Sequence, residues 1–67
     1  MKIFTNYRIE LGKTLTFWGE GDNKLGVTDV VYLWQDRFGG LGDEIIYGTA
    51  VITKILQNNY FEAERIA

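Results

Sequence analysis

The chain lacks cysteine, histidine and serine altogether over its 67 residues. Without cysteine there are no disulfides, thiolate nucleophiles or thiolate metal ligands. Without histidine there is no imidazole ligand, and the side chain that most often serves as general base is missing. Threonine hydroxyls remain, but they lie in or beside stretches where β-branched residues are typical of strands. These absences predict a protein that is not an enzyme, with no catalytic residues, no metal site and no cofactor.

Carboxylates are the next candidates for chemistry. The closest pairs are Asp43 with Glu44, beside a glycine-rich loop, and Glu62 with Glu64. An acid–base pair needs burial or a close like charge to shift its pKa, and the sequence places neither pair in an apolar pocket. The loop 19–26, GEGDNKLG, has neither the twelve-residue frame of an EF-hand nor the spacing of a phosphate-binding loop. We interpret these groups as solvated charges.

Long apolar runs and an excess of positive charge are also missing. A net charge of −2 at pH 7 gives no general attraction for phosphate backbones, which argues against non-specific nucleic-acid binding. No stretch approaches the ~20 apolar residues of a membrane span. The N-terminus lacks the continuous apolar run of a signal peptide. We therefore expect a cytoplasmic protein that does not contact a membrane.

What the chain does have is apolar mass: 46% of its residues are hydrophobic and ten are aromatic. This composition is sufficient for a compact core in a single domain over residues 1–67. A chain of this length buries only about 60% of the surface that its unfolded form exposes. Its stability is therefore expected to be marginal, and we predict a homo-oligomer.

Most of the apolar mass lies in residues 29–51, DVVYLWQDRFGGLGDEIIYGTAV. Two stretches rich in β-branched and aromatic residues, 28–35 and 44–55, flank a loop with three glycines, which is typical of a long hairpin. The first stretch is apolar on both faces, which predicts a position in the middle of a sheet or in an oligomer interface. Gly48, within the second stretch, predicts a bend or bulge of the kind that barrel closure needs.

Residues 2–11 alternate between apolar and polar side chains with a period of two, interrupted only at Phe4. This alternation predicts a half-buried strand over the whole stretch. Gly12 and Lys13 follow as a two-residue turn, and residues 14–18 continue the strand pattern. We therefore expect the first two strands to form a hairpin.

The C-terminal residues fit two structures. Asn58 and Asn59 are typical of a tight turn that leads into a last strand over residues 60–66. Asn59 also suits the N-cap of a short helix with Glu62 at its third position. Two aromatic residues at the start of this stretch favour the strand. The predicted fold class is all-β: a small five-stranded antiparallel barrel-like sheet, with a short C-terminal helix as the alternative for the tail.

Aromatic and arginine residues gather beside the glycine loops at the ends of the predicted strands. Trp34 and Arg37 are the strongest candidates, because an indole and a guanidinium at one rim of a barrel can stack a base or hold a phosphate. The glycines that follow leave backbone N–H groups uncovered, which suits close approach of an anion. Alternatively, the tryptophans close the core and the loop is only a wide turn. The predicted ligand-binding residues are Trp18, Trp34, Arg37, Phe38, Gly39, Gly40 and Tyr47.

The stretch TDVVYLWQDRFGGLGDEIIYGTAV has a recognisable pattern at Asp29, Val31, Leu33, Trp34, Gly40, Ile46, Gly48 and Val51. With these residues, the part of the chain from 18 to 51 resembles the central part of EVE and related PUA-like domains. Thr28 stands where that family normally has a glycine, and the chain is much shorter than the usual family member. The resemblance implies a small β-barrel that holds a modified base or a related nucleic-acid element in an aromatic pocket.

Three functions follow from these observations. The first is a non-enzymatic, oligomeric binding protein of mobile-element or phage type, which holds a nucleotide-like ligand or blocks a host protein as an inhibitor. The second, implied by the resemblance, is a reduced EVE/PUA-like reader of modified DNA or RNA bases. The third is a plain protein–protein interaction module whose aromatic residues are interface anchors. The predicted partners are a second copy of the chain and either a nucleotide-like small molecule or a host protein.

Overall fold

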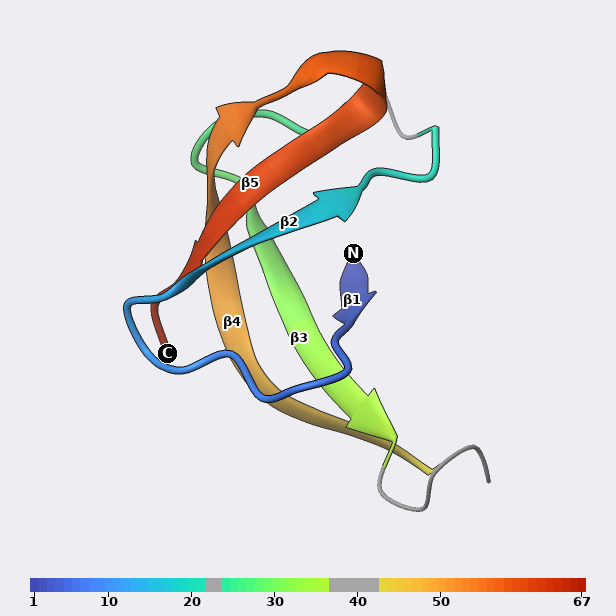
Figure 1. Cartoon of the computed structure of the whole chain (residues 1–67), viewed down its shortest axis with the longest axis vertical. Coiled ribbons are helices and arrows are strands. Elements are labelled where there is room, and N and C mark those ends of the chain that lie inside the picture. Colours follow the sequence, from blue (N-terminus) through green and yellow to red (C-terminus); the bar gives the residue numbers. More distant parts are fainter. Residues whose placement is uncertain (22–23, 37–42) are drawn as a thin grey trace.

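The computed structural model describes residues 1–21, 24–36 and 43–67. These residues form a five-stranded sheet that curls into a half-barrel (Figure 1). The predicted all-β class with five strands is confirmed. The order of the strands in the sheet is β1-β3-β4-β5-β2. The elements are β1 (Lys2–Phe4), β2 (Thr14–Trp18), β3 (Val30–Asp36), β4 (Glu44–Ile55), the short 3-10 turn η1 (Gln57–Asn59) and β5 (Tyr60–Arg65).

The prediction of a fully antiparallel sheet is wrong, because the sheet is mixed. β1 runs parallel to β3, with Ile3 opposite Leu33, and the other three strand pairs are antiparallel. The predicted hairpin of the first two strands is wrong, because β2 pairs with β5 and the first two strands form the two opposite edges of the sheet. A two-residue turn joins only neighbouring antiparallel strands, so the chain between these edges has to be longer.

The strand predicted over residues 2–11 ends at Phe4. Thr5 still donates its N–H to the carbonyl of Trp34 at 3.1 Å, and the chain then leaves β3. Tyr7 and Leu11, which the alternation placed on the buried face, are 82% and 63% exposed. The period of two is present in this stretch, but past Thr5 no strand ladder accompanies it.

A turn forms one residue before the predicted pair Gly12 and Lys13, with Leu11 and Gly12 at its centre. Lys13 donates its N–H to the carbonyl of Glu10 at 3.0 Å, which closes a four-residue β-turn. Gly12 has a φ of +81°, a conformation that favours glycine because a Cβ is strained there. The turn directs the chain into β2 instead of folding it back on β1.

β3 and β4 form the predicted hairpin, and β4 covers the predicted residues 44–55. The pairing slips next to Gly48: Leu33 faces Gly48 and Trp34 faces Ile46, which leaves Tyr47 as an extra residue on β4. This is the bulge that the glycine predicted.

Gly48 also allows a close approach of the C-terminus. A Cβ at this position would stand 2.5 Å from Nε of Arg65 and 2.6 Å from the carbonyl oxygen of Ala67. Real Cβ atoms do not pack at such distances, so the last residues can lie against β4 only because this position carries no side chain.

The tail is a strand and not a helix. Asn58 and Asn59 both have positive φ, 58° and 63°, and the N–H of Tyr60 donates to the carbonyl of Gln57. This is the geometry of a two-residue hairpin turn. β5 then pairs with β4 on one side and with β2 on the other. The helical alternative is wrong because two neighbouring strands satisfy the backbone groups of this segment.

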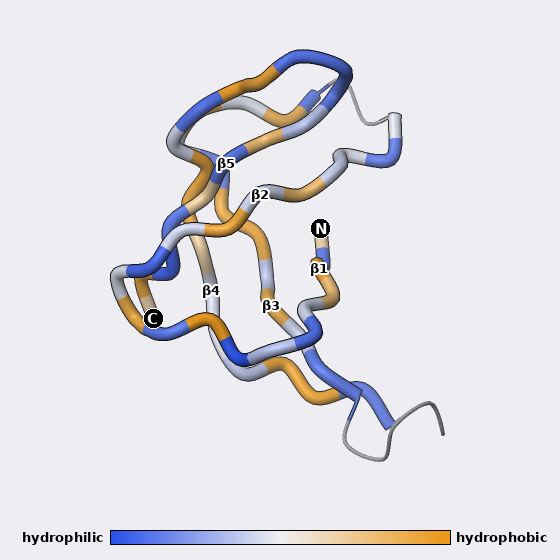
Figure 2. Tube along the Cα trace, viewed as in Figure 1, coloured by the Kyte–Doolittle hydropathy of each residue, from blue (hydrophilic) through white to orange (hydrophobic). Residues whose placement is uncertain are grey.

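The core lies on the inner face of the sheet, and every strand contributes to it. In β3, Val31 and Leu33 are fully buried, while Val30 and Tyr32 on the outer face remain 47% and 46% exposed. The predicted central position of β3 is confirmed by its two neighbouring strands. Hydrophilic residues gather at the loop end of β3 and at the turn between β4 and β5 (Figure 2). The core residues are Ile3, Phe17, Val31, Leu33, Ala50, Ile52, Phe61 and Ala63.

Candidate functional site

Residues 5–13, here called the crossing segment, run across one end of the half-barrel from β1 to β2 (Figure 1). Side chains from the sheet hold this segment in place of a strand ladder. The N–H of Ile9 donates to Oη of Tyr47 at 3.0 Å, and Nη1 of Arg65 donates to the carbonyl of Ile9 at 2.8 Å. Backbone groups that lie away from water need such partners. Tyr47 and Arg65 therefore fix the course of the crossing segment.

Tyr47 is the residue that the β-bulge adds to β4. Besides accepting from Ile9, its hydroxyl shares a 2.8 Å hydrogen bond with Oγ1 of Thr5, a buried side chain. The guanidinium carbons of Arg8 and Arg65 each lie 5.1 Å from the centre of its ring, within the range of cation–π attraction. The ring is thus fixed at its polar end by two hydrogen bonds and is contacted by two guanidinium groups.

Arg65, near the end of β5, contacts three separate backbone positions. In addition to Ile9, its Nη2 donates to the carbonyl of Tyr47 at 3.2 Å and its Nε to that of Ala67 at 3.0 Å. The planar guanidinium is suited to bonding several acceptors at fixed angles. This residue ties together the crossing segment, β4 and the C-terminus.

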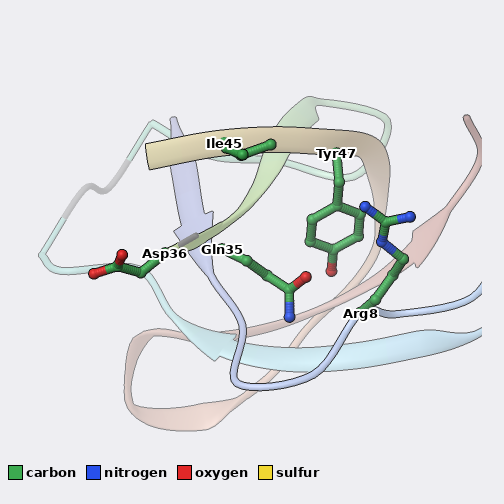
Figure 3. Close-up of a pocket in the computed structure, with 5 residues that line it drawn as sticks. All are labelled: Arg8, Gln35, Asp36, Ile45 and Tyr47. Atoms are coloured by element: carbon green, nitrogen blue, oxygen red, sulfur yellow. The ribbon is translucent and has the colours of Figure 1, made fainter. Parts of the chain in front are cut away.

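A pocket with a volume of about 220 Å³ opens beside this group. We call it the Arg8–Tyr47 pocket, and it is lined by Arg8, Gln35, Asp36, Ile45 and Tyr47. In Figure 3 the side chains of Arg8, Gln35 and Tyr47 converge, whereas Asp36 points away from them. The pocket combines a guanidinium, a primary amide and an aromatic ring, contributed by the crossing segment, β3 and β4.

The pocket has the donors for an anionic or planar polar group. A guanidinium binds carboxylate or phosphate oxygens through paired hydrogen bonds. The Gln35 amide offers two donors and one acceptor, and one of the donors makes only a long bond, 3.4 Å, to the carbonyl of Asn6. The only ion pair between described residues joins Lys2 to Glu44, so Arg8 is not matched to a described carboxylate.

Three of the residues predicted as ligand-binding, Trp18, Trp34 and Tyr47, lie in the described part of the chain, and these three do not come together. Tyr47 does line the pocket. Trp34 packs its ring on Phe4 instead, with centroids 4.9 Å apart. Arg37, Phe38, Gly39 and Gly40 lie outside the described residues, so their part in the prediction stays a prediction.

Trp18 and Trp34 lie toward opposite ends of the sheet. β2, β5, β4 and β3 are successively antiparallel, so β2 and β3 run in opposite directions, and each tryptophan lies toward the C-terminal end of its own strand. Trp18 is 52% exposed and pairs with Tyr60 on β5. The two indoles therefore lie at different rims, which depends on the strand directions and not on the local sequence.

The outer face of the sheet carries a second feature, the outer apolar patch. Phe4 lies opposite Trp34 on β3, and Trp34 lies opposite Ile46 on β4, so the three side chains are cross-strand neighbours. Phe4 and Ile46 are 50% and 51% exposed. The patch consists of Phe4, Val30, Tyr32, Trp34 and Ile46, and the Lys2–Glu44 ion pair lies on the strands that carry it.

Sequence reasoning missed Arg8, Gln35, Asp36 and Ile45 as pocket residues. Arg8 is on the polar side of the strand predicted over residues 2–11, and that strand ends at Phe4. Arg8 and Tyr47 are 39 positions apart in the chain, and they meet only because the crossing segment passes over β4. No local sequence pattern predicts such a contact. The one usable signal was Gly48, since the bulge that it predicts is what turns Tyr47 toward the pocket.

Comparisons with known proteins leave the chain without an assigned relative. No family model, no curated protein and no solved structure matches it. Within residues 1–21, 24–36 and 43–67, no helix is long and apolar enough to cross a membrane. The same residues contain no cluster of three or more acidic side chains arranged to hold a metal ion.

Proposed function

We propose that the chain is a non-enzymatic cytoplasmic binding protein that holds a nucleotide-like ligand in the Arg8–Tyr47 pocket. The observation that carries the proposal is the convergence of Arg8, Gln35 and Tyr47 from three distant parts of the sequence. The guanidinium takes the phosphate oxygens, and the amide bonds a base or sugar edge. Arg8 has the role for which Arg37 was the sequence-based candidate.

The size of the pocket sets which part of the ligand enters. Sites for whole small molecules usually measure about 300–1,000 Å³, and this pocket is smaller, at about 220 Å³. One group of a nucleotide, a phosphate or a base, fits inside while the remainder lies at the mouth. Tyr47 is already held by its hydroxyl and both arginines, so little ordering is required on binding.

Titration followed by ¹H–¹⁵N NMR tests this proposal. The ligands are nucleoside monophosphates, the matching nucleosides and inorganic phosphate, and the reporter is the side-chain amide of Gln35. We expect Arg8→Gln to weaken monophosphate binding by about tenfold or more, because a charge-assisted contact is lost. Lys54→Gln, which removes an exposed cation elsewhere on β4, is the matched control. If no ligand moves the Gln35 signal, or if both variants weaken binding equally, the pocket is not the site.

A second candidate function is the blocking of a host protein, as expected for a phage-type inhibitor or a plain interaction module. The outer apolar patch favours it, because contiguous half-exposed aromatic and aliphatic side chains are typical of protein interfaces. Ile46→Lys should abolish capture of a host protein and leave nucleotide titrations unchanged. Ile55→Lys is the control, since Ile55 lies on the same strand with a similar exposure of 55%. Equal capture by both variants would exclude this surface.

A reduced EVE/PUA-like reader of modified bases ranks third. Such a reader needs an aromatic pocket, and the Arg8–Tyr47 pocket has one aromatic lining residue, Tyr47. Modified and unmodified oligonucleotides titrated at several salt concentrations distinguish this function. A reader would prefer the modified strand and lose affinity as salt rises.

A further inference from the structure

We propose that the free edge of β2 pairs with β2 of a second copy of the chain, in antiparallel direction, with Thr16 on the twofold axis. The proposal is independent of the ligand in the Arg8–Tyr47 pocket. β2 lies at the edge of the sheet, with β5 as its neighbour on one side (Figure 1). Between residues 14 and 18, each position is paired with β5 and with no other described strand.

The hydrogen bonds to β5 show which backbone groups face the free edge. The carbonyl of Lys13 accepts from Arg65 at 2.9 Å, and the N–H of Gly19 donates to Asn59 at 2.8 Å. In an antiparallel pair, backbone groups alternate between the two sides of a strand. The odd-numbered residues of β2 therefore bond to β5, and the N–H and C=O groups of Thr14, Thr16 and Trp18 point to the open side.

This edge has none of the features that usually prevent pairing between sheets. Natural edge strands are protected by lysine, proline, bulges or very short length. The sequence TLTFW has no charge and no proline, its pairing with β5 runs without a register shift, and it is five residues long. The opposite edge, β1, has only three residues and carries Lys2.

The strand is complementary to itself in one register. With Thr16 on the axis, Thr14 of each copy faces Trp18 of the other, so every N–H and C=O on that edge finds a partner. Leu15 then faces Phe17 of the second copy and extends the covered apolar surface on the inner face. If one strand is shifted by two residues along the other, either Thr14 or Trp18 falls opposite a residue outside β2 and its backbone groups lose their partners.

Charges at the two ends of β2 agree with this register. Lys13 of each copy falls opposite Gly19 of the other copy, next to Glu20, and both charged side chains are exposed. The twofold axis repeats this opposite-sign contact at both ends of the interface. A parallel pairing of the two strands would instead place Lys13 beside Lys13 and Glu20 beside Glu20.

Sedimentation velocity over a range of protein concentrations tests the proposal, with circular dichroism to confirm folding. We expect the wild-type chain to shift from monomer to dimer as its concentration rises. Thr16→Pro removes an N–H that β5 does not use, and proline is tolerated where that group faces solvent. It should raise the dimer dissociation constant by about thirtyfold or more, because the bonds at the axis are lost from both copies. Lys2→Pro, a matched change on the other edge, should leave the dimer intact.

Thr16→Lys keeps the test decisive if the proline variant does not fold. It places two like charges opposite each other at the axis and should weaken the dimer by about fivefold. Tyr32→Lys, on the outer apolar patch, should have no effect on association. A wild-type chain that stays monomeric at every concentration overturns the proposal. The proposal is also overturned if both Thr16 variants still form the dimer, or if Tyr32→Lys is the only variant that dissociates it.

Discussion

β4 and the crossing segment both have sequences typical of strands, yet their structures differ. Residues 44–55 are rich in β-branched and aromatic side chains and form the longest strand of the sheet. Residues 5–11 alternate apolar and polar side chains, and residues 5–13 contain no strand. β4 lies between β3 and β5 and bonds to both. The crossing segment bonds to β3 through Thr5 and to β5 through Gly12 and Lys13, and between these points it runs over the end of the half-barrel with no strand beside it. Alternation shows that a segment can form a strand, but a sheet edge in the right place decides whether it does.

The two regions also differ in what stabilises them. The hairpin of β3 and β4 combines a backbone ladder, interrupted only by the bulge at Tyr47, with fully buried aliphatic side chains. Between Thr5 and Gly12, the crossing segment relies on a few side-chain bonds from Tyr47, Arg65 and Gln35. Stability should therefore be spread over many contacts in the hairpin and concentrated on two residues at the crossing.

The largest difference between the two regions should appear when a leucine is replaced by alanine in each of them. Leu33→Ala opens a cavity at a fully buried site and should reduce the free energy of unfolding by about 3 kcal/mol. Leu11→Ala, at a residue that is 63% exposed in the crossing segment, should change it by about 0.5 kcal/mol or less. Urea denaturation measures both. Equal losses would mean that the crossing segment is buried as the alternation predicted.

Arg65→Ala should give the next largest effect. It leaves the part-buried carbonyls of Ile9 and Tyr47 without their donors, and unsatisfied groups of this kind cost about 1–3 kcal/mol. We expect a loss of about 2 kcal/mol, with hydrogen exchange accelerated at the crossing segment before the hairpin. Arg8→Ala, which removes the other arginine beside the Tyr47 ring, should lower stability by no more than about 0.5 kcal/mol. A reversed order of these two effects would contradict the assignment of Arg65 as the structural residue.

Tyr47→Phe isolates the contribution of one hydroxyl. The ring stays packed against the core, while the bonds of the hydroxyl to Thr5 and Ile9 are lost, so we expect destabilisation of about 1 kcal/mol. Tyr7→Phe removes a hydroxyl from a residue that is 82% exposed and should have no measurable effect. If thermal unfolding shows the two variants to be alike, the Tyr47 hydroxyl does not hold the crossing segment.

The smallest effect is expected at the Lys2–Glu44 ion pair. Its side chains are 50% and 36% exposed, and at such exposure solvent screens most of the attraction. Lys2→Met should change the free energy of unfolding by about 0.5 kcal/mol or less. The difference from the wild-type protein should vanish as the salt concentration rises. A larger change that salt does not affect would point to packing of the lysine stem against the outer apolar patch.

Several elements were predictable because their signals are local. The hairpin of β3 and β4 follows from two β-rich stretches around a glycine loop, and the bulge follows from Gly48 within a strand. The turn at Asn58 and Asn59 follows from residue types that tolerate positive φ. The parallel pairing of β1 was not predictable in this way, because its partner lies some thirty residues away and the two segments share no turn.

The candidate site shows the same division. Tyr47 was identified from its place beside the glycine loop, but Arg8 and Gln35 were not, since their convergence depends on where the crossing segment runs. The opposite ends reached by Trp18 and Trp34 follow from the strand directions alone. A set of residue types near one another in sequence is therefore a weaker guide to a site than the topology that places them.

The amino-acid sequence by itself determined that residues 1–67 form a small all-β fold, where the central hairpin and the turns lie, and which catalytic side chains are absent from these residues. These properties depend on residue type and on spacing within a dozen positions, which act through backbone conformation and burial. Only the tertiary structure decided the strand order, the parallel edge, the crossing segment and the Arg8–Tyr47 pocket. Those features arise from contacts between residues far apart in the chain, and such contacts exist only once the strands have paired and the sheet has curled.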